Sequence, residues 1–203
     1  FIKYPDGQLP LFNGTSINFI GQLNEYLEKN AKNKNKKNMM GGLFRFKQRN
    51  HLVFFDVGEP PKKNFSKSYQ SGPLSFEYFL DGIKVVSNSG FGDNISNKAE
   101  LLSRLTACQS TLTLNDTSVS KFERNRTINK VFGNSIKNTF KIYDLNIKNE
   151  DNLISCSATH NGYDKKFSCT HKREISFDKE YSHLKGTDYI FKKKDGIPVR
   201  YAF

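Results

Sequence analysis

The dipeptide Asp81-Gly82 stands between two runs of strand-forming residues, 74–80 and 83–88. Asp and Gly tolerate the positive φ values of a two-residue type I′ turn, so this stretch predicts a β-hairpin. Other short strand-like runs separated by turn residues predict further strands; they are 42–46, 51–57, 110–114, 139–147, 153–160, 167–177 and 187–192. Many short strands in one chain favour an all-β fold, and we expect an antiparallel β-sandwich.

One segment has helical periodicity instead. Apolar residues recur at helical spacing within 16–28 and predict one short helix near the N-terminus. The polar, basic stretch 30–38 that follows predicts a loop. We also expect loops in 116–136, where the pattern of apolar residues is weakest. We therefore expect residues 1–50 to form an N-terminal connecting segment with a short helix and a basic loop. Residues 51–203 should form the β-sandwich domain.

The two ends of the sequence suggest a piece of a longer protein. The chain of 203 residues does not begin with Met, and its final apolar run, 197–203, resembles a strand cut short. We expect the sandwich to be truncated at the C-terminus.

The chain carries a formal net charge of +12. A basic excess favours polyanionic partners, which include nucleic acid, anionic lipid and acidic glycans; its alternative reading is an ordinary solvated surface rich in lysine. No nucleic-acid motif accompanies the charge, so we expect no nucleic-acid partner. No apolar run approaches the roughly 20 residues that span a bilayer, so no membrane span is expected.

The three cysteines, Cys108, Cys156 and Cys169, are odd in number and lack metal-ligand spacing. They imply neither a disulfide framework nor a zinc site. A hairpin turn at Asn161-Gly162 would place Cys156 opposite or diagonal to Cys169. The apolar neighbours of both residues favour two buried free thiols instead.

Two segments carry a resemblance to a known family. The first is 68–90, with Leu-Ser-Phe-Glu before the Asp81-Gly82 turn, and the second is Arg104-Leu-Thr-Ala-Cys-Gln-Ser-Thr-Leu112. They resemble the C-terminal β-domain of the heparinase II/III-like polysaccharide lyases. In that family the first segment reads His-x-His-x-Asp-x-x-Ser-Phe-Glu and ends Val-Asp-x-Gly, and the second contains Arg-x-Thr-Ala-x-His-x-Thr-Leu. Other residues stand at the family's His and Asp positions here; they are Ser68, Gln70, Gly72, Asn88 and Gln109.

The resemblance implies a function. Such lyases cleave a glycosidic bond beside a uronic acid by β-elimination, in which a base removes a proton and an acid protonates the leaving oxygen. It implies an acidic polysaccharide as partner and an upstream α-helical domain that supplies much of the catalytic machinery, so this chain alone should be inactive. The alternative is a non-catalytic glycan-binding or structural module whose site has decayed. The compartment stays open, with a periplasmic or cell-envelope location expected if the full-length protein is exported.

Two residues are the catalytic candidates. The segments 158–163 and 171–173 resemble His-Asp-Gly-Tyr and His-x-Arg segments of heparinase-like proteins. We expect His160 to stand at the mouth of a hairpin where its side chain reaches a ligand, with Tyr163 as its cross-strand neighbour. The alternative for His160 is a turn-end histidine that holds its own hairpin through a backbone hydrogen bond.

Five residues are the candidates for substrate binding. Arg104 matches the family's arginine and could hold a carboxylate bidentately; its alternative is a structural ion pair. His171 is a further candidate, although it alternates in phase with Cys169 and Ile175, which favours a satisfied core histidine. Family positions supply the other candidates, Gln70, Asn88 and Gln109. Since neutral amides are poor ligands for a zinc-like ion, we expect no metal and no other cofactor.

Overall fold

The computed structural model describes residues 3–15, 21, 25, 38–125, 127, 129, 133–192 and 201–202. In this part of the chain, the strands form two larger antiparallel sheets and one small sheet. The five-stranded sheet has the order β1 (Met39–Met40), β2 (Leu43–Gln48), β3 (His51–Asp56), β4 (Phe76–Leu80) and β5 (Ile83–Val86). The four-stranded sheet has the order β10 (His183–Lys192), β9 (Cys169–Asp178), β8 (Leu153–His160) and β7 (Ile142–Asn149). The small sheet pairs β6 (Thr113–Leu114) with β11 (Tyr201–Ala202).

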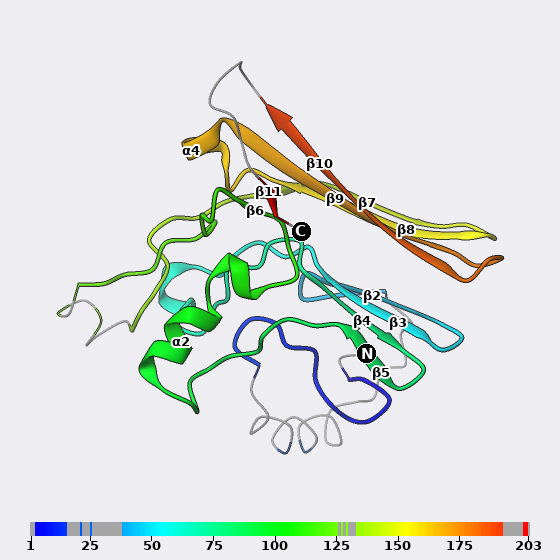
Figure 1. Cartoon of the computed structure of the whole chain (residues 1–203), viewed down its shortest axis with the longest axis horizontal. Coiled ribbons are helices and arrows are strands. Elements are labelled where there is room, and N and C mark those ends of the chain that lie inside the picture. The colour runs from blue at the N-terminus through cyan, green and yellow to red at the C-terminus, as the bar shows by residue number, and fades with distance from the viewer. Residues whose placement is uncertain are drawn as a thin grey trace.

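The two larger sheets lie one above the other (Figure 1). Buried side chains from β2, β3, β8 and β9 meet between them in one apolar cluster; its members include Phe44, Phe46, Val53, Phe55, Ile154, Cys156, Ile175 and Phe177. Inward-facing residues alternate along β9 with outward ones, as a half-buried strand requires. The predicted antiparallel β-sandwich is therefore confirmed.

The strand β3 is buried along its whole length, because both of its faces are covered. One face contacts the core between the sheets. The other packs against the N-terminal segment, where Tyr4 and Phe12 contact Leu52, Phe54 and Phe79. A domain boundary at residue 50 is therefore wrong, since it falls inside the β2–β3 hairpin and separates Tyr4 from the apolar cluster it completes.

The Asp81-Gly82 hairpin is confirmed: φ is 49° at Asp81 and 86° at Gly82, and β4 pairs with β5. The strand predicted at 153–160 also has the expected bounds. The strand predicted at 110–114 is shorter than expected and retains only Thr113–Leu114. The helix predicted at 16–28 lies outside the described residues apart from Gly21 and Glu25, both of which are helical.

Two α-helices that the sequence did not predict, α2 and α4, have defined bounds among the described residues. Helix α2 (Asn97–Ser103) begins after Ser96, whose side chain accepts a hydrogen bond from the Ala99 backbone N–H. Helix α4 (Asp164–Phe167) lies in the connection between β8 and β9. The part of the chain that the structure describes contains no helix long and apolar enough to cross a membrane.

Helix α4 overturns the predicted hairpin turn at Asn161-Gly162. The connection is longer than a two-residue turn, so His160 pairs with His171, and Cys156 pairs with Ile175 instead of Cys169. All three cysteines are free, and Cys156 and Cys169 are buried, as the apolar neighbours indicated.

The core predicts the effect of a large-to-small substitution. Phe177 is fully buried between the sheets, so Phe177→Ala should lower the free energy of unfolding by about 3–5 kcal/mol in chemical denaturation. The matched control is Phe65→Ala, because Phe65 is 78% exposed. That variant should change stability by no more than about 0.5 kcal/mol. Equal losses in the two variants would contradict this account of the core.

Candidate functional site

The amides at three family positions lie together although they are far apart in the sequence. Gln70 Nε2 donates to the carbonyl of Ser103 at 3.1 Å and to that of Gly90 at 2.9 Å. Gln109 Nε2 donates to the same Ser103 carbonyl at 2.7 Å. Gln70 is 2% exposed and Gln109 is 8% exposed. The two side chains therefore fasten the end of α2 to neighbouring loops.

Asn88 belongs to the same buried layer. Its Oδ1 accepts hydrogen bonds from the backbone N–H and the hydroxyl of Ser110, at 2.9 Å and 3.0 Å. Its Nδ2 is buried and has no hydrogen-bond partner among the described residues. This burial does not support the expectation that Gln70, Asn88 and Gln109 contact substrate, which stays a prediction. Among the described residues, no group of three or more His, Cys, Asp or Glu side chains could hold a metal ion.

Arg104 is fully buried, and its guanidinium binds three backbone carbonyls. Its Nε, Nη1 and Nη2 donate at 2.7–2.8 Å to carbonyls that belong to Tyr69, Asn134 and Ser66. The Phe122 ring covers it, with 4.1 Å between Cζ and the ring centroid. Burial lowers the pKa of Arg104 to about 10, so it remains charged at neutral pH. The three carbonyl partners differ from both the expected bidentate carboxylate contact and the alternative ion pair, and the substrate-binding role of Arg104 stays a prediction.

His160 is fully buried, and its place in a hydrogen-bond chain fixes its proton. The backbone N–H of Gly162 donates to His160 Nδ1 at 3.1 Å, so the proton of the neutral ring is on Nε2. The Nε2–H of His160 donates to His171 Nδ1 at 3.0 Å, which places the proton of His171 on its own Nε2. His171 then donates to Asp188 Oδ1 at 2.6 Å.

Burial is the largest cause that lowers the pKa of both imidazoles, and Asp188 only partly offsets it. Both rings are therefore neutral at pH 7. The burial of His160 gives no support to the expectation that its side chain reaches a ligand, whereas the alternative, a turn-end histidine bonded to the backbone, agrees with the contact from Gly162. His171 is a core histidine with both ring nitrogens satisfied.

Tyr163 is also buried, at 1% exposed, and its hydroxyl donates to the carbonyl of Leu112 at 2.8 Å. It is not a cross-strand neighbour of His160, because it precedes α4. Burial raises its pKa above the usual value. Residue 162, directly before Tyr163, must be glycine, since a Cβ there would lie 2.3 Å from Val119 Cγ1. The catalytic roles of His160 and Tyr163 remain predictions without an accessible side chain to support them.

Asp188 and Arg173 complete the chain. Arg173 Nε and Nη2 donate to the two carboxylate oxygens of Asp188 at 2.7 Å and 2.8 Å. Burial alone would raise the pKa of Asp188, but the hydrogen bonds from His171 and Arg173 hold it well below its usual value. Arg173 Nη1 also donates to the carbonyls of Leu74 and Ser110, which lie outside the four-stranded sheet.

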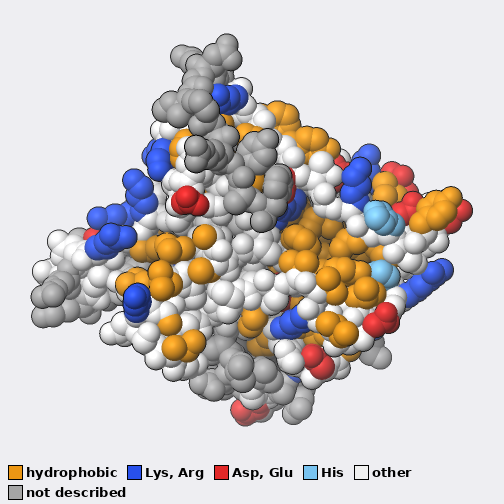
Figure 2. All heavy atoms as spheres, viewed as in Figure 1, with side chains coloured by type: hydrophobic (Ala, Val, Ile, Leu, Met, Phe, Trp, Pro, Cys, Tyr) orange, Lys and Arg blue, Asp and Glu red, His pale blue; other side chains and the backbone are white. Residues whose placement is uncertain are grey.

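A large open concavity lies above this buried layer, and we call it the α2 groove. Its volume is about 1030 Å³, and its lining combines apolar side chains with cations; it includes Leu101, Leu102, Leu105, Phe122, Lys98, Lys121, Arg124 and Lys137. On the side of the molecule that carries α2, Figure 2 shows hydrophobic side chains beside Lys and Arg side chains. Asp116 and Glu123 also line the groove, and Lys137 pairs with Glu123 at 3.1 Å. Sequence reasoning missed this groove because α2 was not predicted.

The buried candidates support the walls of the α2 groove. Phe122 and Asn134, which line it, are the residues that cover and accept from Arg104. Thr117, another lining residue, has its carbonyl 3.5 Å from the Tyr163 hydroxyl. The side chains at the family positions therefore support the groove from inside the fold, and the exposed charged side chains are those that line the groove.

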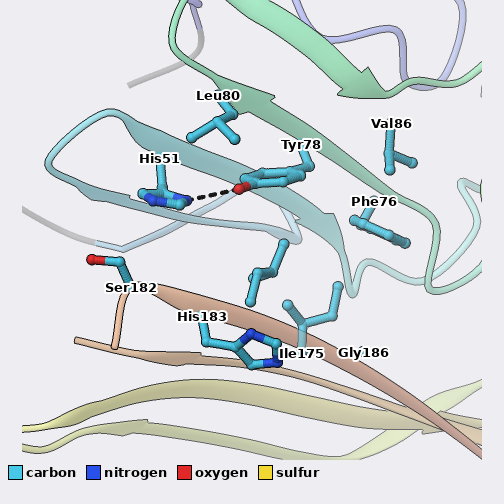
Figure 3. Close-up of a pocket in the computed structure, with 10 residues that line it drawn as sticks. His51, Phe76, Tyr78, Leu80, Val86, Ile175, Ser182, His183 and Gly186 are labelled. Atoms are coloured by element: carbon cyan, nitrogen blue, oxygen red, sulfur yellow. Dashed lines mark hydrogen bonds between the residues drawn. The ribbon is translucent and has the colours of Figure 1, made fainter. Parts of the chain in front are cut away.

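A second cavity, of about 450 Å³, opens between the two sheets at β4, β5 and β10 (Figure 3). His51 and Tyr78 project into it from one sheet, joined by a 2.7 Å hydrogen bond between Nδ1 and the hydroxyl. His183 lines it from the other sheet. Its lining is mostly apolar and, unlike that of the α2 groove, includes neither Lys nor Arg.

Residues 32–203 match the family described as heparinase II/III-like, C-terminal. The chain belongs to the heparinase II/III-like family. Solved structures share its fold: a heparinase III with 16% identity and a TM-score of 0.63, and the heparan sulfate lyase HepC from Pedobacter heparinus with 20% identity and a TM-score of 0.58. The match to the heparinase III covers 96% of this heparinase II/III-like chain and 31% of the other chain. The match to HepC covers 88% of this chain and 29% of the other. The search of curated proteins found no match.

The Arg104 contacts predict a stability effect. Arg104→Lys should lower the free energy of unfolding by about 2–4 kcal/mol, because an ammonium cannot reach three carbonyls in the guanidinium geometry. Chemical denaturation measures it, with Arg124→Lys, at the exposed groove rim, as control. If Arg104→Lys left stability unchanged and weakened polysaccharide binding, the result would support a substrate-binding role for Arg104 instead.

The histidine pair predicts a dependence on pH. Below the ordinary histidine pKa of about 6.5 the unfolded chain binds protons at His160 and His171, while the folded chain resists them. The free energy of unfolding should therefore fall as pH decreases, by roughly 2–3 kcal/mol from about pH 6.5 to 5 if both rings stay neutral. The double variant His160→Gln, His171→Gln should lose this slope, and His183→Gln should keep it.

The buried carboxyl of Asp56 has a pKa raised by burial to about 6, so its contribution to stability falls as pH rises. It is present in all three proteins and cancels from their differences. An identical slope in the double variant would contradict the buried, neutral state of the two imidazoles.

Proposed function

We propose that this chain is the sandwich part of a polysaccharide lyase that cleaves uronate-containing acidic polysaccharide by β-elimination. Family membership supports the proposal, and so do the neighbours of the same fold, whose names are heparinase III and heparan sulfate lyase. The α2 groove is the feature of this chain that carries it, because it presents Lys98, Lys121 and Arg124 with no ion pair among the described residues.

The chemistry of β-elimination needs such cations. The proton beside a uronate carboxylate becomes removable only when the carboxylate charge is offset, which lysine and arginine side chains in the groove could do. The predicted catalytic side chains of this chain, His160 and Tyr163, are buried. The base and the acid are therefore assigned to a further α-helical domain of the protein, and this chain alone should be inactive.

A specific observation favours a second candidate, a non-catalytic glycan-binding or structural module. Amides occupy three of the family's histidine and aspartate positions: Gln70 and Gln109 donate to backbone carbonyls and Asn88 accepts from Ser110, so none of them presents an ionisable group to a ligand. Under this alternative the α2 groove binds the glycan without any bond cleavage.

The lyase proposal predicts a product and a groove effect. The full-length protein should release unsaturated uronate from an acidic polysaccharide such as heparan sulfate, seen as ultraviolet absorbance. Lys121→Gln with Arg124→Gln should lower kcat/KM by about tenfold or more, because each lost cation weakens the hold on the uronate. Lys62→Gln with Lys63→Gln serves as the control, because it removes the same two positive charges outside the groove. Absence of product across a broad uronate panel would favour the non-catalytic module.

A further inference from the structure

The outer face of the four-stranded sheet is turned away from the core, on the upper side of the molecule in Figure 1. The strand register places its outward side chains in cross-strand rows. The first row is Tyr143, Thr159, Lys172 and Tyr189; the second is Asn146, Ser157, Glu174 and Thr187; the third is Lys148, Ser155, Ser176 and Lys185. We call these three rows the outer face.

The outer face contains aromatic, hydroxyl, amide and charged side chains and no aliphatic one. A surface that packs against another protein domain usually buries an apolar centre, which these rows lack. Their composition suits a ligand that is polar and also has flat faces for stacking. Carbohydrate is the class of polymer with both properties.

The central strand β8 supplies recessed hydroxyl groups. Ser155, Ser157 and Thr159 are 6%, 5% and 4% exposed, because longer side chains stand on both sides of them. Their hydroxyls make no hydrogen bond within the part of the chain that the structure describes. They are therefore available to donate to and accept from sugar hydroxyls.

Aromatic side chains stand at the edges of this face. Tyr143 on β7 is 38% exposed, and Tyr189 on β10 is 41% exposed. Phe191, two residues further along β10, is 51% exposed; its ring lies 6.3 Å from that of Tyr189 with only 11° between the ring planes. Parallel exposed rings about one sugar ring apart form a platform for the C–H faces of successive sugars.

The charge of the outer face selects the kind of glycan. The outer face carries three lysines, Lys148, Lys172 and Lys185, and only one carboxylate, that of Glu174. The three lysines form no ion pair among the described residues, and Lys172 lies 5.9 Å from the Tyr189 ring. The excess of positive charge complements a polyanion.

We infer that the outer face, with Phe191, is an accessory binding site for an acidic polysaccharide chain, separate from the α2 groove. The inference depends on the proposed function for the class of glycan. The two sites do not share residues, since the groove is lined by residues between 97 and 137 and the outer face by strands from 142 onward. Such a site would hold the polymer on the protein while the groove acts on another part of it.

The test measures binding of heparan sulfate oligosaccharides to this chain by isothermal titration calorimetry, at two salt concentrations. Tyr189→Ala with Phe191→Ala should weaken binding about tenfold, a loss typical of removing an interfacial aromatic anchor. Lys148→Gln with Lys185→Gln should also weaken it and reduce its salt dependence. Because these side chains are exposed, the thermal unfolding of each variant should match that of the parent chain.

Matched controls separate this site from the groove and from charge alone. Tyr181→Ala removes a 76% exposed aromatic residue elsewhere, and Lys62→Gln with Lys63→Gln removes the same charge elsewhere; both should leave the affinity within about twofold. Lys121→Gln with Arg124→Gln probes the α2 groove.

Loss of binding only in the groove variant would overturn the inference and leave the proposed function intact. Equal weakening by the Lys62/Lys63 control, or no binding to any acidic polysaccharide, would also overturn it. Loss in the outer-face variants, with the groove variant unchanged, supports it even if the full-length protein releases no product.

Discussion

The buried guanidinium of Arg173 is the interaction on which the arrangement of the two sheets depends. It joins Asp188 of the neighbouring strand through two hydrogen bonds, and it donates to the carbonyls of Leu74 and Ser110 across the sandwich. Removing one partner of a buried pair typically costs about 3–5 kcal/mol, because the other charge is left uncompensated. The pair thus links the four-stranded sheet to the loops that hold the family positions.

The residues at the family positions form a second layer that holds the exposed surface in place. Gln70 and Gln109 satisfy the backbone carbonyl of Ser103 at the end of α2, and Arg104 satisfies carbonyls of the neighbouring loops, such as that of Ser66. The loops in turn carry α2 and the groove. This explains how the chain keeps the fold of heparinase II/III-like proteins while amides stand at positions where the family has histidine and aspartate.

Local signals in the sequence predicted the parts of the fold that local chemistry determines. The Asp81-Gly82 turn and the strand β8 were predicted correctly because turn geometry and period-two alternation act over a few residues. Helix α2 was missed, since it is short and two of its leucines are exposed, and α4 was missed inside a presumed turn. The site was predicted poorly because burial and carbonyl partners depend on packing between distant segments; nothing adjacent to Arg104 reveals that Asn134 accepts its hydrogen bond.

His160, the predicted catalytic histidine, is a buried structural link with a defined proton. Long-range ¹H–¹⁵N spectra of the imidazoles test it directly. We expect His160 and His171 both to be neutral with the proton on Nε2, and both to stay neutral below the usual histidine pKa. A proton on Nδ1 of either ring, or a free titration of His160 near its ordinary pKa, would contradict it.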